Sequence, residues 1–195
     1  MVPGLPNALT AARVLVIPPL VVLILQSEDG SSAPAAWLFA LAALSDALDG
    51  HLARARGLVT TFGKIADPIA DKLLVGAALA SLVAVDRLGA WVAVIVVARE
   101  LAVSGLRAVA GRQGLVIAAS SFGKVKMALQ VAMVISLIAA PDASAAWLLG
   151  VVYATVAVTI ASGIDYFVAF RQRAPAKPVR VRVPGTAPAG KQTPF

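Results

Sequence analysis

The composition of this chain is typical of an integral membrane protein. Of its 195 residues, 59% are hydrophobic and 14% are charged, and the mean hydropathy is +0.87, whereas a soluble domain has about 45–50% apolar and about 25% charged residues. The chain has no cysteine, which excludes disulfides and thiolate metal sites. A net charge of +7 would suit nucleic acid, but the basic residues are spread over several loops and a tail. We therefore predict an all-α integral membrane protein with no nucleic-acid partner.

Six apolar stretches are long enough to cross a membrane as helices. Crossing about 30 Å of hydrocarbon takes roughly 20 residues, and most of the stretches are rich in Ala, Gly and Val, which let helix backbones approach closely. The first stretch has one basic residue, Arg13, and no cleavage site, so we expect a retained helix rather than a signal peptide. The predicted helices cover about residues 9–26, 35–53, 67–85, 89–109, 124–141 and 146–169.

Most of the basic residues gather on one side of the predicted membrane domain. That side carries 14 Lys and Arg, and the opposite connections carry only Arg87. The positive-inside rule then places both termini in the cytoplasm. Trp37, Trp91 and Trp147 each open an even-numbered helix on the opposite side, where aromatic residues are typical of the membrane interface. We predict a multi-pass protein of the cell membrane with its polar site facing the cytoplasm.

The end of the chain has a different composition. From about Arg171 it reads "RQRAPAKPVRVRVPGTAPAGKQTPF", and such a Pro-, Gly- and Arg-rich segment cannot build a packed core. We expect a six-helix membrane domain over residues 1–170 and a disordered cytoplasmic tail over residues 171–195. The tail either attracts anionic headgroups of membrane lipid or only follows the positive-inside pattern.

Four aspartates lie in "DALDGHLARARGLVTTFGKIADPIAD", where the second and third predicted helices reach the cytoplasmic side. Asp46 and Asp49 share one helix face, and Asp67 and Asp71 share another. If the two helices pack as a hairpin, the two pairs converge. Each unpaired aspartate in hydrocarbon costs about 2.5–3.5 kcal/mol, so a cation or a water-filled pocket must compensate. Carboxylate oxygens bind hard divalent cations, and we predict Mg²⁺ or Mn²⁺.

The alternative is that the acids form salt bridges with Lys72, Arg54 or Arg99. A metal site is favoured because the local acids outnumber the basic partners within the helices. The small residues Gly50 and Ala53 beside the acids suit a nucleotide diphosphate that docks against backbone and metal.

The spacing of these residues is similar to the signature of the CDP-alcohol phosphotransferase family. The signature has eight positions, and all spacings are kept: Asp46, Asp49, Gly50, Ala53, Arg54, Gly63, Asp67 and Asp71. The resemblance covers about residues 5–170. It implies a reaction in which an alcohol attacks the lipid-side phosphorus of a CDP-linked donor, CDP-diacylglycerol, and CMP leaves. It also implies a homodimer.

The same resemblance implies roles for the signature residues. The four aspartates, Asp46, Asp49, Asp67 and Asp71, would surround the divalent metal, and Asp71 would also be the general base for the acceptor hydroxyl. The nucleotide would be lined by Asp46, Gly50, Ala53, Arg54 and Gly63.

Other basic residues on the cytoplasmic side suit an acceptor that carries its own phosphate. On the fourth predicted helix, Glu100, Ser104 and Arg107 share a face, and Arg99 lies about a quarter turn away. Arg and Lys bind phosphate through charge-assisted hydrogen bonds. The candidate residues for the acceptor phosphate are Arg13, Arg99, Arg107, Lys124 and Lys126. The alternative is that Arg107, Lys124 and Lys126 only mark the membrane interface.

Several strings resemble one branch of the family, the phosphatidylglycerophosphate synthases, which use glycerol 3-phosphate as the acceptor. They are "LPNALTAARVLVIP", "FGKIADPIADKLLV", "ARELAVSGLR" and "SFGKVKM". Transfer to phosphatidylglycerol or to an inositol phosphate stays open as an alternative. A small cation transporter is the alternative from another class. Transporter sites lie near the bilayer midplane on broken helices or inverted repeats, whereas these acids lie toward the cytoplasmic end and no repeat is visible.

Overall fold

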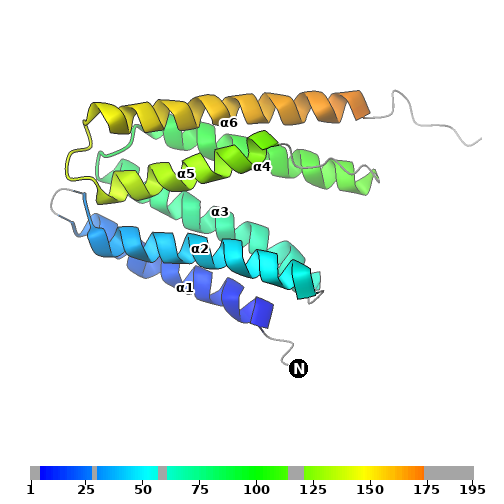
Figure 1. The fold of residues 1–195 in the computed structure, drawn as a ribbon, viewed down its shortest axis with the longest axis horizontal. Coiled ribbons are helices and arrows are strands. Elements are labelled where there is room, and N and C mark those ends of the chain that lie inside the picture. The colour runs from blue at the N-terminus through cyan, green and yellow to red at the C-terminus, as the bar shows by residue number, and fades with distance from the viewer. Residues whose placement is uncertain (1–4, 28–29, 57–60, 114–120, 174–195) are drawn as a thin grey trace, which may run out of the picture.

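The structure, a computed structural model, describes residues 5–27, 30–56, 61–113 and 121–173 (Figure 1). Side chains are described for residues 12–27, 30–45, 69–113 and 123–173. Within these ranges the chain is all-α, as predicted, with six helices and no strand. The helices are α1 (Leu5–Leu25), α2 (Ala33–Arg56), α3 (Thr61–Ala84), α4 (Ala90–Arg112), α5 (Ser121–Ala139) and α6 (Ala146–Arg173).

The helices run alternately in opposite directions, so the bundle has two chemically different ends (Figure 1). The connections α1–α2, α3–α4 and α5–α6 lie at one end, on the left of Figure 1. Trp37, Trp91 and Trp147 lie in the first two turns of α2, α4 and α6, and their side chains are 48–70% exposed. We call this the tryptophan end. The opposite end, where α2 ends and α3 begins, carries the acid motif and is called the motif end.

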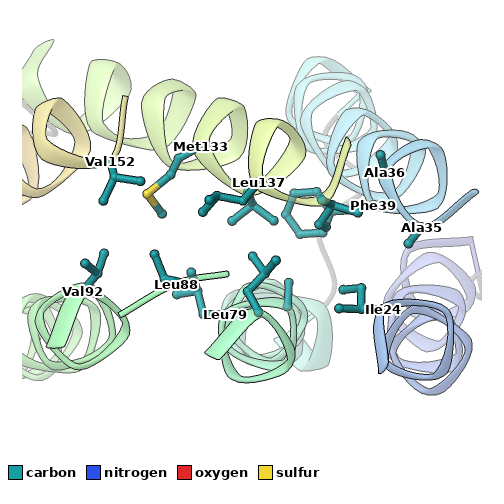
Figure 2. Close-up of a cluster of buried hydrophobic side chains, with 14 of the residues drawn as sticks. Ile24, Ala35, Ala36, Phe39, Leu79, Leu88, Val92, Met133, Leu137 and Val152 are labelled. Atoms are coloured by element: carbon teal, nitrogen blue, oxygen red, sulfur yellow. The ribbon is translucent and has the colours of Figure 1, made fainter. Parts of the chain in front are cut away.

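A continuous apolar core holds the tryptophan end together (Figure 2). Ile24 of α1, Phe39 of α2 and Leu79 of α3 meet Leu137 of α5, and all are at most 1% exposed. Small residues permit this close approach, since Ala35 lies beside Phe39 on α2 and is itself fully buried. The core therefore fixes the relative positions of the helices that carry the motif further along.

The hairpin of the second and third helices, which the sequence analysis considered as a condition for the acid pairs to converge, is not the main packing arrangement of the described residues. Instead, α1 packs against both α2 and α3, most extensively against α3, and α5 also contacts both. The two acid-bearing helices are thus positioned mainly through α1 and α5. Direct contact between α2 and α3 plays the smaller part.

The described residues contain one helix, α6, that is long and apolar enough to cross a membrane. The apolar runs of α1 and α2 within the described side chains are shorter, at Ala12–Leu25 and Ala33–Ser45. Charged side chains raise the cost of burying α4 in lipid, since it carries Arg99, Glu100 and Arg107. The six-span topology stays a prediction. Helix α6 also continues to Arg173, slightly beyond the domain end expected at residue 170.

Arg87, the sole basic residue of the opposite connections, ties the tryptophan end together. It is 6% exposed, and its Nη2 donates a hydrogen bond to the carbonyl of Ala140, just after α5. Its aliphatic stem also packs on Gly30 in the α1–α2 connection, where a Cβ would lie 2.5 Å from Arg87 Cδ. One side chain thus joins three connections. This structural use accounts for a basic residue on the side that positive-inside patterning leaves almost without charge.

We expect Gly30→Ala to lower stability, because Gly30 has φ +67° and no room for a Cβ. The left-handed conformation costs a non-glycine residue about 1–2 kcal/mol, so the apparent melting temperature in detergent should fall by about 2–8 °C. The matched control is Gly150→Ala in α6, where a Cβ meets nothing within 4 Å and alanine is the better helix former. Equal melting temperatures for the two variants would contradict this role of Gly30.

Candidate active site

All four aspartates of the motif lie on helical backbone at the motif end. Asp46 and Asp49 are on the second half of α2, and Asp67 and Asp71 are on the first half of α3. Asp71 is half-buried and interacts with a neighbouring group. No group of three metal-ligating side chains occurs among those described, but most of the predicted metal and nucleotide sites lie outside them. The residues concerned are Asp46, Asp49, Gly50, Ala53, Arg54, Gly63 and Asp67.

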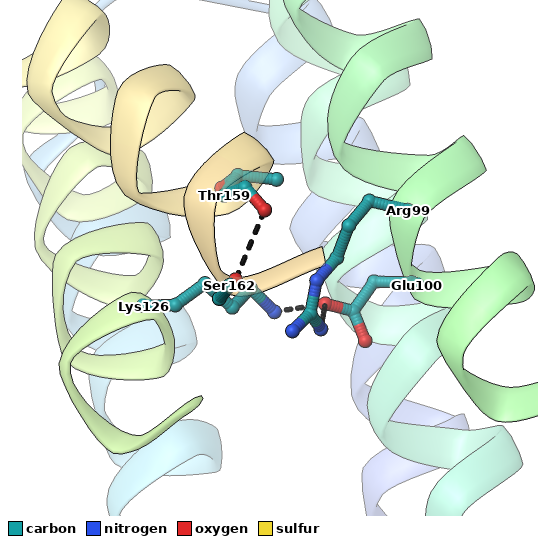
Figure 3. A network of polar contacts seen from close by, with 5 residues as sticks. All are labelled: Arg99, Glu100, Lys126, Thr159 and Ser162. Atoms are coloured by element: carbon teal, nitrogen blue, oxygen red, sulfur yellow. Dashed lines mark hydrogen bonds and ion pairs between the residues drawn. The ribbon is translucent and has the colours of Figure 1, made fainter. Parts of the chain in front are cut away.

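Three charged side chains from α4 and α5 form an ion cluster, which we call the α4–α5 cluster: Arg99, Glu100 and Lys126 (Figure 3). Lys126 Nζ donates to Glu100 Oε1, and Arg99 Nη1 donates to the same oxygen at 3.3 Å. The side chains of Lys126 and Arg99 are 7% and 15% exposed, and that of Glu100 is 22% exposed. Two of the predicted acceptor residues, Arg99 and Lys126, are therefore brought together with a net positive charge.

Helix α6 forms the wall beside this cluster. A Cβ on Gly163 would lie 3.3 Å from Arg99 Cγ, so the bare glycine lets the arginine stem pass close to α6. Thr159 and Ser162 lie near the cluster, and Ser162 Oγ donates to the carbonyl of Thr159 at 2.9 Å (Figure 3). Both residues are buried. The acceptor candidates thus face a polar strip of α6 rather than apolar packing.

Our sequence analysis missed this strip, although the sequence contains a signal for it. Thr155, Thr159, Ser162 and Tyr166 follow one another at intervals of four, three and four, the spacing of one helix face. All four are buried in the described structure. Hydroxyl groups at helical spacing in an otherwise apolar helix indicate a face that meets other polar groups.

Several buried polar atoms on α4, α5 and α6 have no hydrogen-bond partner within the described part of the chain. They are Arg99 Nε on α4, Gln130 Oε1 on α5, and Thr159 Oγ1 and Tyr166 OH on α6. An unsatisfied buried group costs about 1–3 kcal/mol, and such groups commonly meet a water, an ion or a ligand. The polar surfaces of these three helices therefore suit an oxygen-rich ligand.

The cluster and the acid motif belong to one electrostatic neighbourhood. The negative charge of Asp71 on α3 favours the charged form of Lys126 on α5, and these two helices are in contact. A molecule with a phosphate at Lys126 would therefore approach the helix that carries the predicted general base.

The other three acceptor candidates lie elsewhere. Arg107 is exposed, and its guanidinium carbon is 5.6 Å from the centre of the Tyr166 ring, a cation–π contact. Lys124 is exposed near the start of α5. Arg13 is buried on α1, which packs against α3, and has an interaction of its own. Glu100, which the sequence analysis grouped with Ser104 and Arg107, instead pairs with Lys126.

Comparison with known proteins decides the family. The family model described as CDP-alcohol phosphatidyltransferase matches residues 4–161, which include the whole acid motif and the α4–α5 cluster. The chain belongs to this family. The family assignment drawn from the eight-position motif is thus confirmed, and with it the class of enzyme, a phosphatidyltransferase.

Curated members of the CDP-alcohol phosphatidyltransferase family match over most of their length. The CDP-diacylglycerol–glycerol-3-phosphate 3-phosphatidyltransferase of Bacillus subtilis is 38% identical over 185 residues, covering 84% of this chain and 93% of its own. The protein of the same name from Rickettsia felis is 36% identical, with 87% and 96% covered. A probable phosphatidylglycerophosphate synthase of Mycobacterium tuberculosis is 39% identical, with 84% and 79% covered.

We expect Glu100→Ala to destabilise the protein, because it leaves Lys126 and Arg99 close together without their shared carboxylate. The loss should be about 1–3 kcal/mol, the range for leaving a buried polar group unsatisfied. Apparent melting temperatures in detergent measure it. The control is Asp165→Ala, which removes an exposed carboxylate from α6. A melting temperature equal to that of the control would show that the cluster contributes no stability.

Proposed function

We propose that the protein transfers the phosphatidyl group of CDP-diacylglycerol to glycerol 3-phosphate, giving phosphatidylglycerophosphate and CMP. The observation that carries this proposal is the acid motif with every spacing kept, in a chain that matches relatives named for this reaction over most of its length. The α4–α5 cluster adds a physical reason for the acceptor. Two cations held together by one carboxylate suit a small alcohol that carries a phosphate.

We place a divalent cation, Mg²⁺ or Mn²⁺, at the four aspartates. Members of the family generally depend on a divalent metal. The donor set fits such an ion, because all four side chains offer carboxylate oxygens and stand on two helices at the same end of the bundle. When bound, the cation would neutralise charge on the pyrophosphate and on the departing CMP. The holding residues are Asp46, Asp49, Asp67 and Asp71.

The chain's own groups position the reactants and move one proton. Asp71 accepts the proton of the glycerol 3-phosphate hydroxyl, whose oxygen bonds to the phosphorus that carries diacylglycerol. The bond from this phosphorus to the oxygen of CMP breaks. Such transfers depend mostly on positioning and charge neutralisation. In this proposal the CDP group is bound by Asp46, Gly50, Ala53, Arg54 and Gly63.

Arg99 and Lys126 are the best-supported ligands for the acceptor phosphate. They converge on one oxygen and are largely buried. Buried Arg13 on α1 is a third candidate, since α1 packs on the helix of Asp71. Exposed Arg107 and Lys124 fit the alternative reading, as markers of the membrane interface.

We further propose that all six helices span the cell membrane, with both termini and the motif end in the cytoplasm. Two observations support this orientation. The three tryptophans share one end of the bundle, and the basic connections lie toward the other. Large exposed apolar side chains, among them Leu15, Leu41 and Val94, suit contact with lipid or with a second copy in a homodimer.

CMP release by the purified protein tests the reaction. The protein in detergent and lipid receives CDP-diacylglycerol and Mg²⁺, with glycerol 3-phosphate, phosphatidylglycerol or inositol 1-phosphate as the acceptor. We expect metal-dependent CMP with glycerol 3-phosphate, and phosphatidylglycerophosphate by mass spectrometry. CMP with another acceptor would preserve the chemistry and replace the acceptor. A folded sample that is silent with every acceptor would reopen the cation-transporter alternative.

Asp71→Asn should abolish turnover while CDP-diacylglycerol still binds, because the amide cannot take the hydroxyl proton. General-base catalysis contributes about 10²- to 10⁴-fold, so the CMP release rate should fall at least that far. Asp165→Asn, which alters an exposed carboxylate on α6, serves as the control. Near wild-type turnover by Asp71→Asn would refute the assigned base.

Lys126→Gln should weaken acceptor binding selectively. Losing one charge-assisted hydrogen bond to phosphate raises KM for glycerol 3-phosphate roughly ten- to hundredfold, while KM for CDP-diacylglycerol stays unchanged. The matched control is Arg112→Gln, which removes an exposed cation from the end of α4. Equal changes in both KM values would indicate general damage rather than a phosphate ligand.

A further inference from the structure

Glu100 binds both cations that the proposed acceptor phosphate needs. One of its oxygens, Oε1, accepts hydrogen bonds from Lys126 Nζ on α5 and from Arg99 Nη1 on its own helix (Figure 3). A carboxylate oxygen between a lysine and an arginine resembles a phosphate oxygen in charge and in accepting geometry. The two anions would compete for the same donors.

We propose that the Glu100 carboxylate occupies the place of the acceptor phosphate on Lys126 and Arg99. When glycerol 3-phosphate binds, its phosphate displaces this carboxylate from the two cations. The proposal rests on the function proposed above, because it assumes that Lys126 and Arg99 bind that phosphate. Glu100 is then a positioning residue that acts through these two cations and touches no reacting atom.

The exposure of the three side chains supports displacement. Glu100 is 22% exposed, whereas Arg99 is 15% and Lys126 is 7% exposed. The carboxylate is therefore the member of the cluster with the most access to solvent, and the cations are held more deeply. In this proposal the more exposed carboxylate turns away, and the more deeply buried cations stay in place.

The unsatisfied donors nearby indicate a ligand with more oxygens than one carboxylate supplies. Arg99 Nε and Thr159 Oγ1 are buried and have no hydrogen-bond partner within the described ranges. Glu100 uses one oxygen, Oε1, for its contacts with both cations. A phosphate group carries three terminal oxygens and could therefore engage the two cations and still offer an acceptor to a neighbouring donor.

Removing the charge of Glu100 should therefore strengthen anion binding. In Glu100→Gln we expect inorganic phosphate to bind roughly three- to tenfold more tightly by titration calorimetry, because the displaced competitor is weaker. KM for glycerol 3-phosphate should fall by a similar factor. Arg112→Gln is the control for a general change of charge, and Lys126→Gln should change both quantities in the opposite direction. A residue that merely organises the cations would, when replaced, weaken anion binding.

A second measurement on the unmodified sequence covers the case in which the variant does not fold. The chain has two glutamates, Glu28 and Glu100, so carboxyl-¹³C glutamate labels two side-chain carboxylates, and Glu28→Gln assigns their signals. Inorganic phosphate should shift the Glu100 signal toward that of a solvated carboxylate. An unmoved signal at saturating phosphate, or weaker or unchanged phosphate binding by a folded Glu100→Gln protein, would overturn the proposal. If wild-type protein makes no CMP with glycerol 3-phosphate, the proposed function itself fails.

Discussion

The cost of placing charge inside an apolar helix bundle governs this structure. An ion without a partner in such surroundings is expensive, so each described buried charge has a specific arrangement around it. Arg87 donates to a main-chain carbonyl at the tryptophan end. Lys126 and Arg99 share one carboxylate between α4 and α5. The first arrangement joins three connections of the chain, whereas the second brings two cations to one carboxylate oxygen between α4 and α5. The Arg87 contact therefore belongs to the structural scaffold, and the α4–α5 cluster belongs to the candidate site.

The scaffold and the candidate site occupy different positions along the length of the helices. Toward the tryptophan end the interior is a continuous set of Leu, Ile, Val, Phe and Ala side chains. Further along, the same helices present Glu100, Lys126, Thr159 and Ser162 to one another. A lipid-linked donor needs this combination, because its acyl chains remain in hydrocarbon while its nucleotide and the acceptor require polar partners. The family assignment and the polar α4–α5 cluster thus both fit chemistry on a lipid-linked substrate.

The sequence predicted the features that depend on local spacing. Apolar length gave the six helices, and the aspartate intervals gave the family. It did not predict that Glu100 pairs with Lys126, because the two residues are 26 apart in the chain and their meeting depends on how α4 and α5 rotate about their axes. It also suggested an α2–α3 hairpin, since neighbours in sequence often pack together, whereas α1 and α5 supply most of the described contacts. The side-chain geometry of the metal and nucleotide sites stays a prediction.

The tie made by Arg87 lies at one end of the bundle, far from the aspartates. It holds three connections at the tryptophan end, next to the rigid core. Helices α2 and α3 each have 24 residues, so each is about 36 Å long. A tilt of about 5° at the tied end therefore displaces the far end by about 3 Å, comparable to a hydrogen-bond length. Small changes in packing at the tryptophan end would therefore produce larger displacements at the helix ends that carry the aspartates.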